Sequence, residues 1–427
     1  QRPLKWQHQT LHSPQPSPKL TPFWCGDSFV PHTCRMIDQT RSSKVLLIAG
    51  ILLIAVNLRP ALASVGPLIE DIRESTGLLS SQLGLLTTLP LIAFGVFSTL
   101  TPLLTRRFGI GATLVGSMGL LAIGAAMRAI DSLPALYLGT VLLGIAIACG
   151  NVLLPTLTKR NFAMRSGLVT SLYSSAMGLG AALAAGLSVP LADDYHLGWR
   201  GSLAIWAIPA TIACVLWLPQ LSRLTKAAPS RSFLAAMHHL GRSRLAWSVA
   251  LFMGLQSLTF YVVLAWLPAV LISRGADASY AGWMLSLSQA MGIFGSLIVP
   301  TWAGQYVSQR AFIGCLAGLE TASLVGLMVG SPSWATVWVL LIGFVLGGSF
   351  GLALLFIVVR SSSTASATEL SGMAQSIGYL IAAVGPSLFG GLFDLRGDWT
   401  WAFAFLLMVA AFKLAMGLTA GANQTVD

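Results

Sequence analysis

Apolar residues occur in this chain in long blocks of about 20, separated by short polar stretches that carry Gly, Pro or charged residues. A helix of 20 residues, at about 1.5 Å per residue, crosses the roughly 30 Å hydrocarbon core of a bilayer. Only 9% of the residues are charged and 55% are hydrophobic, whereas a soluble domain has about 25% charged residues. The sequence therefore predicts an all-α membrane protein.

Twelve membrane-spanning helices are expected, with the following ranges: 45–69, 83–104, 111–127, 133–154, 167–191, 201–218, 246–272, 280–302, 312–329, 334–359, 372–393 and 399–418. The one long connection, 219–245, is basic, and we expect it to be a cytoplasmic linker between an N-terminal six-helix bundle (41–218) and a C-terminal one (246–420). Residues 421–427 form a tail. Residues 1–40 have no apolar run, so we expect a disordered extension there and a functional start near Met36.

The two predicted bundles share a sequence pattern. Five residues at the fifth span recur 205 positions later at the eleventh: Ser166, Gly167, Ser171, Gly180 and Gly186 correspond to Ser371, Gly372, Ser376, Gly385 and Gly391. Duplicated halves are the construction of many alternating-access transporters. The pattern predicts two six-helix pseudo-repeats.

The formal charge of +11 is explained by the orientation of the chain in the membrane rather than by a nucleic-acid partner. Fourteen basic residues fall in loops on the side that carries both termini, and five fall on the other side: Arg73, Arg128, Arg200, Arg274 and Arg396. This bias places both termini in the cytoplasm. We expect a multi-pass protein of a bacterial inner membrane, which contacts lipid and a small-molecule substrate, works as a monomer and binds no nucleic acid.

Motifs for enzymatic or ATP-driven chemistry are absent from the sequence. It contains no GxxxxGK[ST] phosphate loop, no HExxH and no CxxC, and its five cysteines are scattered. We therefore expect no metal site, no catalytic residues and no cofactor. A membrane enzyme or scaffold is the alternative of a different class, and it would need a catalytic constellation that these residues do not offer.

Arg59 is the polar residue with the strongest functional signal. It lies 14 residues into the first span, about 21 Å deep at 1.5 Å per residue, where a charge is costly and usually functional. Pro60 follows it, and Gly66-Pro67 lies further along, so the helix is expected to be weakened where it lines a cavity. Arg59 is then a candidate site for an anionic or polar substrate, or a structural residue bonded to carbonyl groups.

Glu320 is the only acid in the middle of a predicted span. An isolated carboxyl there would stay protonated unless it is paired, so Glu320 is a candidate for coupling transport to protons. The alternative is a neutral hydrogen bond between helices.

Uncharged polar residues near the middle of other spans could complete a small-ligand pocket. These are Asn57, Asn151, Gln256, Tyr261, Gln289 and Gln375. Each alone is more typical of contacts between helices, and the first five join Arg59 as predicted substrate-binding residues.

Several strings of residues resemble one family. They are NLRP at 57–60 with GPL at 66–68, LTTLP at 86–90, GNVLLP at 150–155 with Lys159-Arg160, AWLP at 265–268 and LWLP at 216–219. With these strings the chain from about 44 to 418 resembles the major facilitator superfamily, in its branch of cyanate and 2-nitroimidazole transporters, and the nitroimidazole-type members are the most similar.

The superfamily's loop signature between helices two and three, usually G-x-x-x-D-R-x-G-R-K, is degraded in this chain. Arg106 stands at the Asp position, and only Arg107 and Gly109 match. The resemblance makes Arg106 and Arg107 candidates for a cytoplasmic gate, although this chain lacks the Asp that the signature usually supplies to that gate.

The resemblance implies a secondary active transporter that moves a small polar or anionic compound, cyanate-like or nitroimidazole-like, by alternating access. It also implies that helices one, four, seven and ten line a central cavity while three, six, nine and twelve lie outside, which counts against Glu320 as the coupling acid. The alternative within the same fold is an exporter of toxic compounds with broader specificity. Import and export, the coupling ion and the substrate stay open at this stage.

Overall fold

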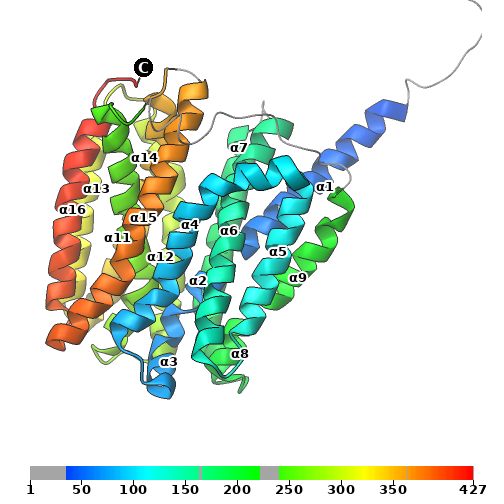
Figure 1. The fold of residues 1–427 in the computed structure, drawn as a ribbon. Helices are drawn as coiled ribbons and strands as arrows, with labels where there is room; N and C mark the ends of the chain where they lie inside the picture. Colours follow the sequence, from blue (N-terminus) through cyan, green and yellow to red (C-terminus); the bar gives the residue numbers. More distant parts are fainter. Residues whose placement is uncertain (1–34, 163–165, 222–239, 363, 427) are drawn as a thin grey trace, which may run out of the picture. The chain divides into compact units, whose positions relative to one another are not determined.

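The computed structural model describes residues 35–162, 166–221, 240–362 and 364–426. Its elements are α1 (Arg35–Asn57), α2 (Pro60–Ala63), η1 (Gly66–Leu68), α3 (Ile69–Thr76), α4 (Ser80–Phe108), α5 (Ile110–Met127), α6 (Leu133–Asn161), α7 (Ser166–Ala192), α8 (Gly198–Ala204), α9 (Ala207–Trp217), η3 (Leu218–Gln220), α11 (Arg244–Ile272), α12 (Ala278–Ala303), α13 (Arg310–Val329), η4 (Pro332–Trp334), α14 (Ala335–Val359), α15 (Thr364–Arg396) and α16 (Thr400–Ala420) (Figure 1). These ranges contain one isolated β-bridge, between Ser361 and Val426.

The twelve predicted spans are confirmed, since twelve helical segments of the described chain are long and apolar enough to cross a membrane. Residues 46–427 form one compact unit and residues 1–45 another. In the shorter unit the described part is the start of α1, which begins at Arg35 and so includes residues predicted to be disordered. Most of that predicted extension (1–34) and most of the connection between the bundles (222–239) lie outside the described residues, so the bundle boundaries stay predictions.

The unit 46–427 has apolar side chains both inside and outside. Buried aliphatic and aromatic residues form two clusters between the helices, while large apolar residues such as Leu216, Val358 and Phe412 are more than half exposed. A water-soluble protein rarely exposes so many large apolar groups. The exposed groups are the surface expected to face lipid.

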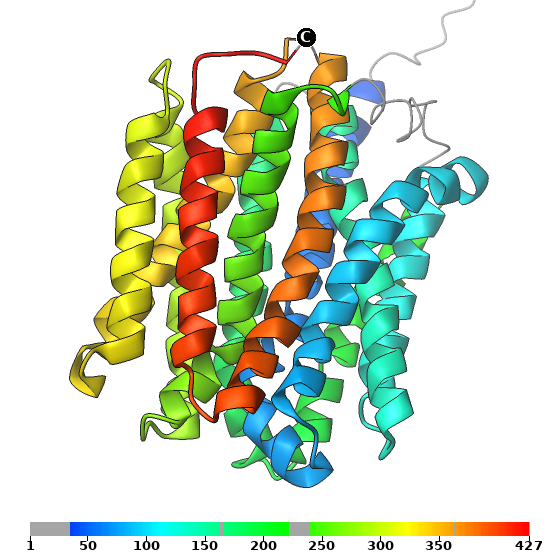
Figure 2. The ribbon, with the colours of Figure 1, turned by 60° about the vertical axis from the view of Figure 1, so that its left-hand side comes forward.

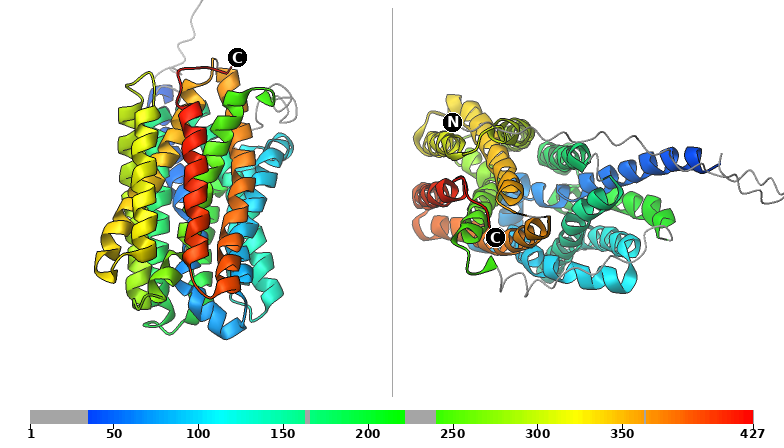
Figure 3. Two further views of the ribbon diagram at one scale, coloured as in Figure 1. Left: turned by 90° about the vertical axis from the view of Figure 1, so that its left-hand side faces the viewer. Right: turned by 90° about the horizontal axis from the view of Figure 1, so that it is seen from above.

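One helix lies at the centre of the unit. α11 packs against α12, α14, α15 and α16, and 83% of its most apolar window is buried. Between residues 46–221 and 240–426, which we call the N-terminal and C-terminal halves, the main contacts are α4 with α15 and α7 with α12. Figure 2 shows α4 and α15 side by side, and Figure 3 shows α16 at the edge of the unit.

We call the end of the unit with Ser80 and Asp394 the outer end, because the charge bias predicts that it is external. The opposite end, with Arg107 and Arg360, is the inner end. In Figure 1 the outer end is at the bottom.

The first span is broken at the position of its proline. α1 ends at Asn57, and the chain continues through the short α2 and η1 to α3. The amide of Val65 bonds the carbonyl of Leu62, three residues back, instead of the carbonyl of Ala61. The break therefore leaves the Ala61 carbonyl without a partner from its own helix, which is costly away from water.

Arg128 supplies the missing partner. It caps the end of α5, is 1% exposed, and donates from Nη1 to the Ala61 oxygen at 2.7 Å. The sequence placed Arg128 in an external loop because it directly follows the third span, but the side chain turns inward to the first span. Burial lowers the pKa of Arg128 to about 10, so the guanidinium stays protonated at neutral pH.

Replacing Arg128 with Met removes the only side-chain donor that the structure gives to the Ala61 carbonyl. We expect a loss of about 1–3 kcal/mol in stability, because a buried acceptor is left unpaired. The measurement is thermal unfolding of the purified protein in detergent. Arg200→Met is the matched control, because Arg200 pairs with an Asp131 side chain that is 90% exposed and such pairs contribute less than about 1 kcal/mol. Equal losses in the two variants would contradict the assignment.

Candidate functional site

A central cavity of about 160 Å³ lies between the two halves. Its described lining comes from the break after α1, from α2 and from α4, α6, α7, α11, α12, α14 and α15. The third, sixth, ninth and twelfth spans contribute no described residue to it. These four peripheral spans are the ones that the family resemblance implies. The lining itself is broader than expected, because the second, fifth, eighth and eleventh spans join the first, fourth, seventh and tenth.

Arg59 reaches this cavity from the break in the first span. It stands between α1 and α2, with φ −114° and ψ −26°, and is the only charged residue among the described residues of the lining. Its guanidinium carbon lies 4.9 Å from the centre of the Phe260 ring on α11. This contact is within cation–π range, so an aromatic face holds the cation in the cavity without neutralising it.

Aromatic side chains form one wall beside Arg59. Phe260 meets Tyr261 edge-to-face at 5.1 Å between ring centres, and Phe94 of α4 meets Tyr379 of α15 at 5.3 Å in the same way. All four rings line the cavity. Tyr261 was predicted from the sequence, whereas Phe94 and Tyr379 were not. Each belongs to an apolar helix on which sequence does not show which face meets the cavity.

The predicted amide residues fall into two groups. Asn151, Gln256 and Gln289 line the cavity, as does Gln375. Gln256 is 1% exposed and donates to the Met253 carbonyl and the Ser257 hydroxyl, so its acceptor oxygen is the group left for other partners. Asn57 is not part of the described lining, and its amide donates to the Leu53 carbonyl one turn back, at 2.8 Å.

Glu320 lies outside the cavity lining. On α13 it forms an ion pair with Lys413 of α16, and both residues are almost fully buried, at 0% and 3% exposure. The sequence-based alternatives were a coupling acid and a neutral hydrogen bond, and the structure replaces the neutral bond with an ion pair. The signal that was missed is Lys413, a lone lysine within the twelfth predicted span.

The two gate candidates lie in the last turn of α4, at the inner end. Both are exposed, and Arg107 stacks over the neighbouring Phe108 ring at 5.4 Å. Their proposed role in gating stays a prediction.

The cavity combines one fixed cation, aromatic faces and amide groups, with no carboxylate among its described lining residues. Such a site can attract an anion or the negative end of a dipole, stack a planar group and hydrogen-bond its edge. The lining contains no nucleophile–base pair that would make it an active site, and the described residues hold no cluster of potential metal ligands.

Known proteins resemble this chain in sequence and in fold. Residues 45–386 match the model of the Major Facilitator Superfamily. The chain is 39% identical to the 2-nitroimidazole transporter of Escherichia coli over 90% of its own length and 97% of that protein. It is 31% identical to the cyanate transport protein CynX of Escherichia coli, over 86% and 95% of the two chains.

Among solved structures, the chain resembles a D-xylose–proton symporter with a TM-score of 0.69 at 16% identity, over 88% of this chain and 96% of the symporter. This likeness shows the fold alone. The sequence relatives cover nearly the whole chain and confirm the branch that the motifs indicated. The chain therefore belongs to the major facilitator superfamily, and it is a multi-pass secondary transporter of small compounds rather than an enzyme.

Proposed function

We propose that the protein carries a small polar or anionic compound, cyanate-like or nitroimidazole-like, and that Arg59 binds it. The observation that carries this proposal is that Arg59 is the only charged group among the described cavity residues and lies against the Phe260 ring. A guanidinium offers several donors in a planar fork. Cyanate and nitro groups present oxygen or nitrogen acceptors, and a planar heterocycle would stack on the neighbouring rings.

The substrates named for the two relatives agree with this chemistry, since one is a nitroheterocycle and the other a small anion. An exporter of broader specificity is the second candidate, and the largely apolar and aromatic lining favours it. A substrate panel separates the two, because a broad exporter would also carry uncharged apolar compounds and would depend less on Arg59.

We further propose that the chain consists of two related halves. Gly180 of α7 packs against the Val56 carbonyl of the first span, while Gly385 of α15 packs against Leu258 of the seventh. A second echoed glycine pair behaves in the same manner, since Gly186 meets Trp283 of the eighth span and Gly391 meets Ser81 of the second. The fifth span contacts the first and the eighth, and the eleventh span contacts the seventh and the second. These are corresponding helices of the two halves, which supports two pseudo-repeats.

For its setting, we propose a monomer in a bacterial inner membrane, with both termini cytoplasmic and without nucleic acid as a partner. The support is the charge bias of the loops and the bacterial source of the two relatives.

The test of the site is counterflow in proteoliposomes with cyanate, other small anions and nitroheterocycles. We expect Arg59→Ala to weaken apparent affinity by roughly 10–100-fold, since a hydrogen bond to a charged group contributes about 1.5–3 kcal/mol. Arg59→Lys should recover part of the affinity, because it keeps the charge but loses the fork. Arg242→Ala, an exposed arginine outside the cavity, is the matched control. Unchanged transport by both Arg59 variants would remove Arg59 from the site.

A second test concerns Glu320 and Lys413, which we propose to be a structural pair. Glu320→Gln or Lys413→Met alone should cost about 3–5 kcal/mol in thermal unfolding, because each leaves a buried charge unpaired. The double variant should regain most of this stability, since removing both members of a buried pair is often neutral. Counterflow should then remain, and so should any transport that a proton gradient drives in the unmodified protein. Loss of such proton dependence alone, in a stable double variant, would instead make Glu320 the coupling acid.

A further inference from the structure

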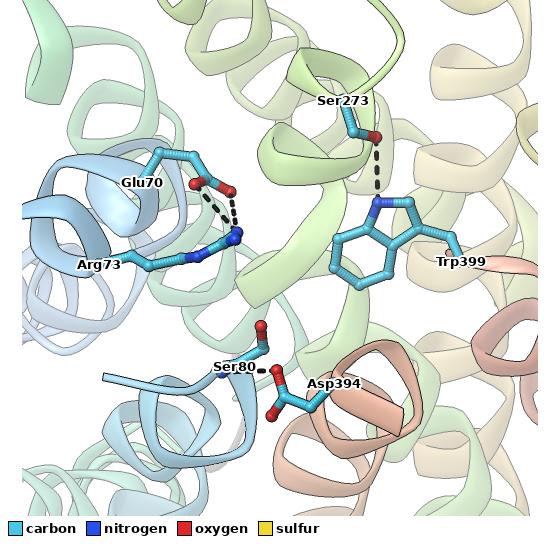
Figure 4. Close-up of polar contacts among 6 residues, drawn as sticks. All are labelled: Glu70, Arg73, Ser80, Ser273, Asp394 and Trp399. Atoms are coloured by element: carbon cyan, nitrogen blue, oxygen red, sulfur yellow. Dashed lines mark hydrogen bonds and ion pairs between the residues drawn. The ribbon is translucent and has the colours of Figure 1, made fainter. Parts of the chain in front are cut away.

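At the outer end a carboxylate of the C-terminal half caps a helix of the N-terminal half. Asp394, in the last turn of α15, accepts hydrogen bonds from the amides of Ser80 (3.0 Å) and Ser81 (2.7 Å) at the start of α4. Figure 4 shows the carboxylate of Asp394 directed at Ser80. The partners are more than 300 residues apart in sequence, so this contact joins the two halves.

Two other helices have an aspartate of the same half that accepts hydrogen bonds from amides at the helix start. Asp277 accepts from the amides of Ser279 and Tyr280 at the start of α12, and Asp398 accepts from the amide of Thr400 at the start of α16. In both, the carboxylate lies in the preceding connection, as is usual for an N-cap. At α4 the N-cap position holds Leu79, whose side chain cannot cap. The first amides of α4 depend on Asp394 instead.

Further contacts join α4 and α15 beside Asp394, at the outer end. Thr88 of α4 donates to the Ala383 carbonyl at 2.7 Å and meets the Ser387 hydroxyl at 3.1 Å. Gly84 packs so closely against the Pro386 backbone that a Cβ atom would not fit there. All these residues lie nearer the outer end of α4 and α15 than Phe94 and Tyr379, which line the cavity. In an alternating-access cycle these contacts between the halves would separate when the outer end opens.

Asp394 is the charged side chain among these hydrogen-bonded contacts. The nearby Arg73 pairs with Glu70 at 3.3 Å (Figure 4). It also stacks over Phe393 of α15 at 5.9 Å, which adds a second contact between the halves but no hydrogen bond to Asp394 in the described chain. Asp394 itself is exposed, so its carboxylate can exchange the two amides for water. A charge-assisted bond is about twice as strong as a neutral one, yet this one can break without stranding a buried charge.

We propose that Asp394 is the latch of the outer gate: its bonds to α4 stabilise the outward-closed state and set how often the outer end opens. This goes beyond the role of Arg59 and does not depend on it. Asp394 touches no cavity residue in the described contacts, so it acts on the conformational equilibrium rather than on the substrate.

The test measures opening directly, without a substrate. A reporter cysteine replaces Ser387, half-buried at the α4–α15 contact, in a chain whose five native cysteines are changed to serine or alanine. A membrane-impermeant maleimide is added to right-side-out vesicles. We expect Asp394→Ala to speed labelling about tenfold, equivalent to about 1.4 kcal/mol, and Asp394→Asn, which keeps an acceptor without charge, to speed it less.

Ser80→Pro tests the other side of the same bond. Proline suits the first position of a helix and its predecessor must be extended, as Leu79 already is, with φ −69° and ψ 155°. This variant removes one of the two amides that Asp394 binds and should also speed labelling. Asp277→Asn is the matched control, because it weakens a cap of the same kind within one half. Labelling that is unchanged in the Asp394 and Ser80 variants, or equally raised by Asp277→Asn, would overturn the latch, as would faster labelling only in inverted vesicles.

Discussion

The requirement that buried backbone groups find partners governs how this protein can present a charge inside a membrane. A continuous first helix would satisfy all its own carbonyls, whereas Pro60 and the turn that follows leave the Ala61 carbonyl free. Arg128 bonds that carbonyl from the end of α5. The break is therefore held from outside the first span, and Arg59 occupies the position between α1 and α2 that the break creates. The buried Arg128 thus supports the place from which the partly exposed Arg59 reaches the cavity.

The cavity leaves the charge of Arg59 largely uncompensated. Among the described residues its guanidinium lies against the face of Phe260, a contact that contributes about 0.5–2 kcal/mol, and no carboxylate lies in the described lining. A carboxylate there would satisfy the arginine permanently and compete with an anionic substrate. With an aromatic face in that position, the guanidinium keeps its orientation while its hydrogen-bond donors stay available. The negative charge that balances Arg59 is then expected to come from the substrate.

The sequence was informative wherever the bilayer restricts which residue types can occupy a position. Span length, the cost of Arg59 and the proline after it predicted the twelve helices and the weakened first span, and both are confirmed. It did not show the directions of side chains in space. Arg128 lies in the turn after the third span, as predicted, yet its side chain points inward. Asn57 was predicted to bind substrate together with Arg59. It lies on α1 before the break and bonds its own helix, and its binding role stays a prediction. The same limit explains why Phe94 and Tyr379 were missed, because apolar helices in lipid have no polar face that would reveal which side meets a cavity.

Two of the described carboxylates that join different helices, Glu320 and Asp394, differ in what they can do. Glu320 and Lys413 are buried within the C-terminal half, and separating them would leave charges in a low dielectric, so α13 and α16 are expected to move together. Asp394 is exposed and binds backbone amides across the halves, where water can replace either partner. Burial therefore assigns the first pair to permanent structure and allows the second contact to break and re-form in each transport cycle.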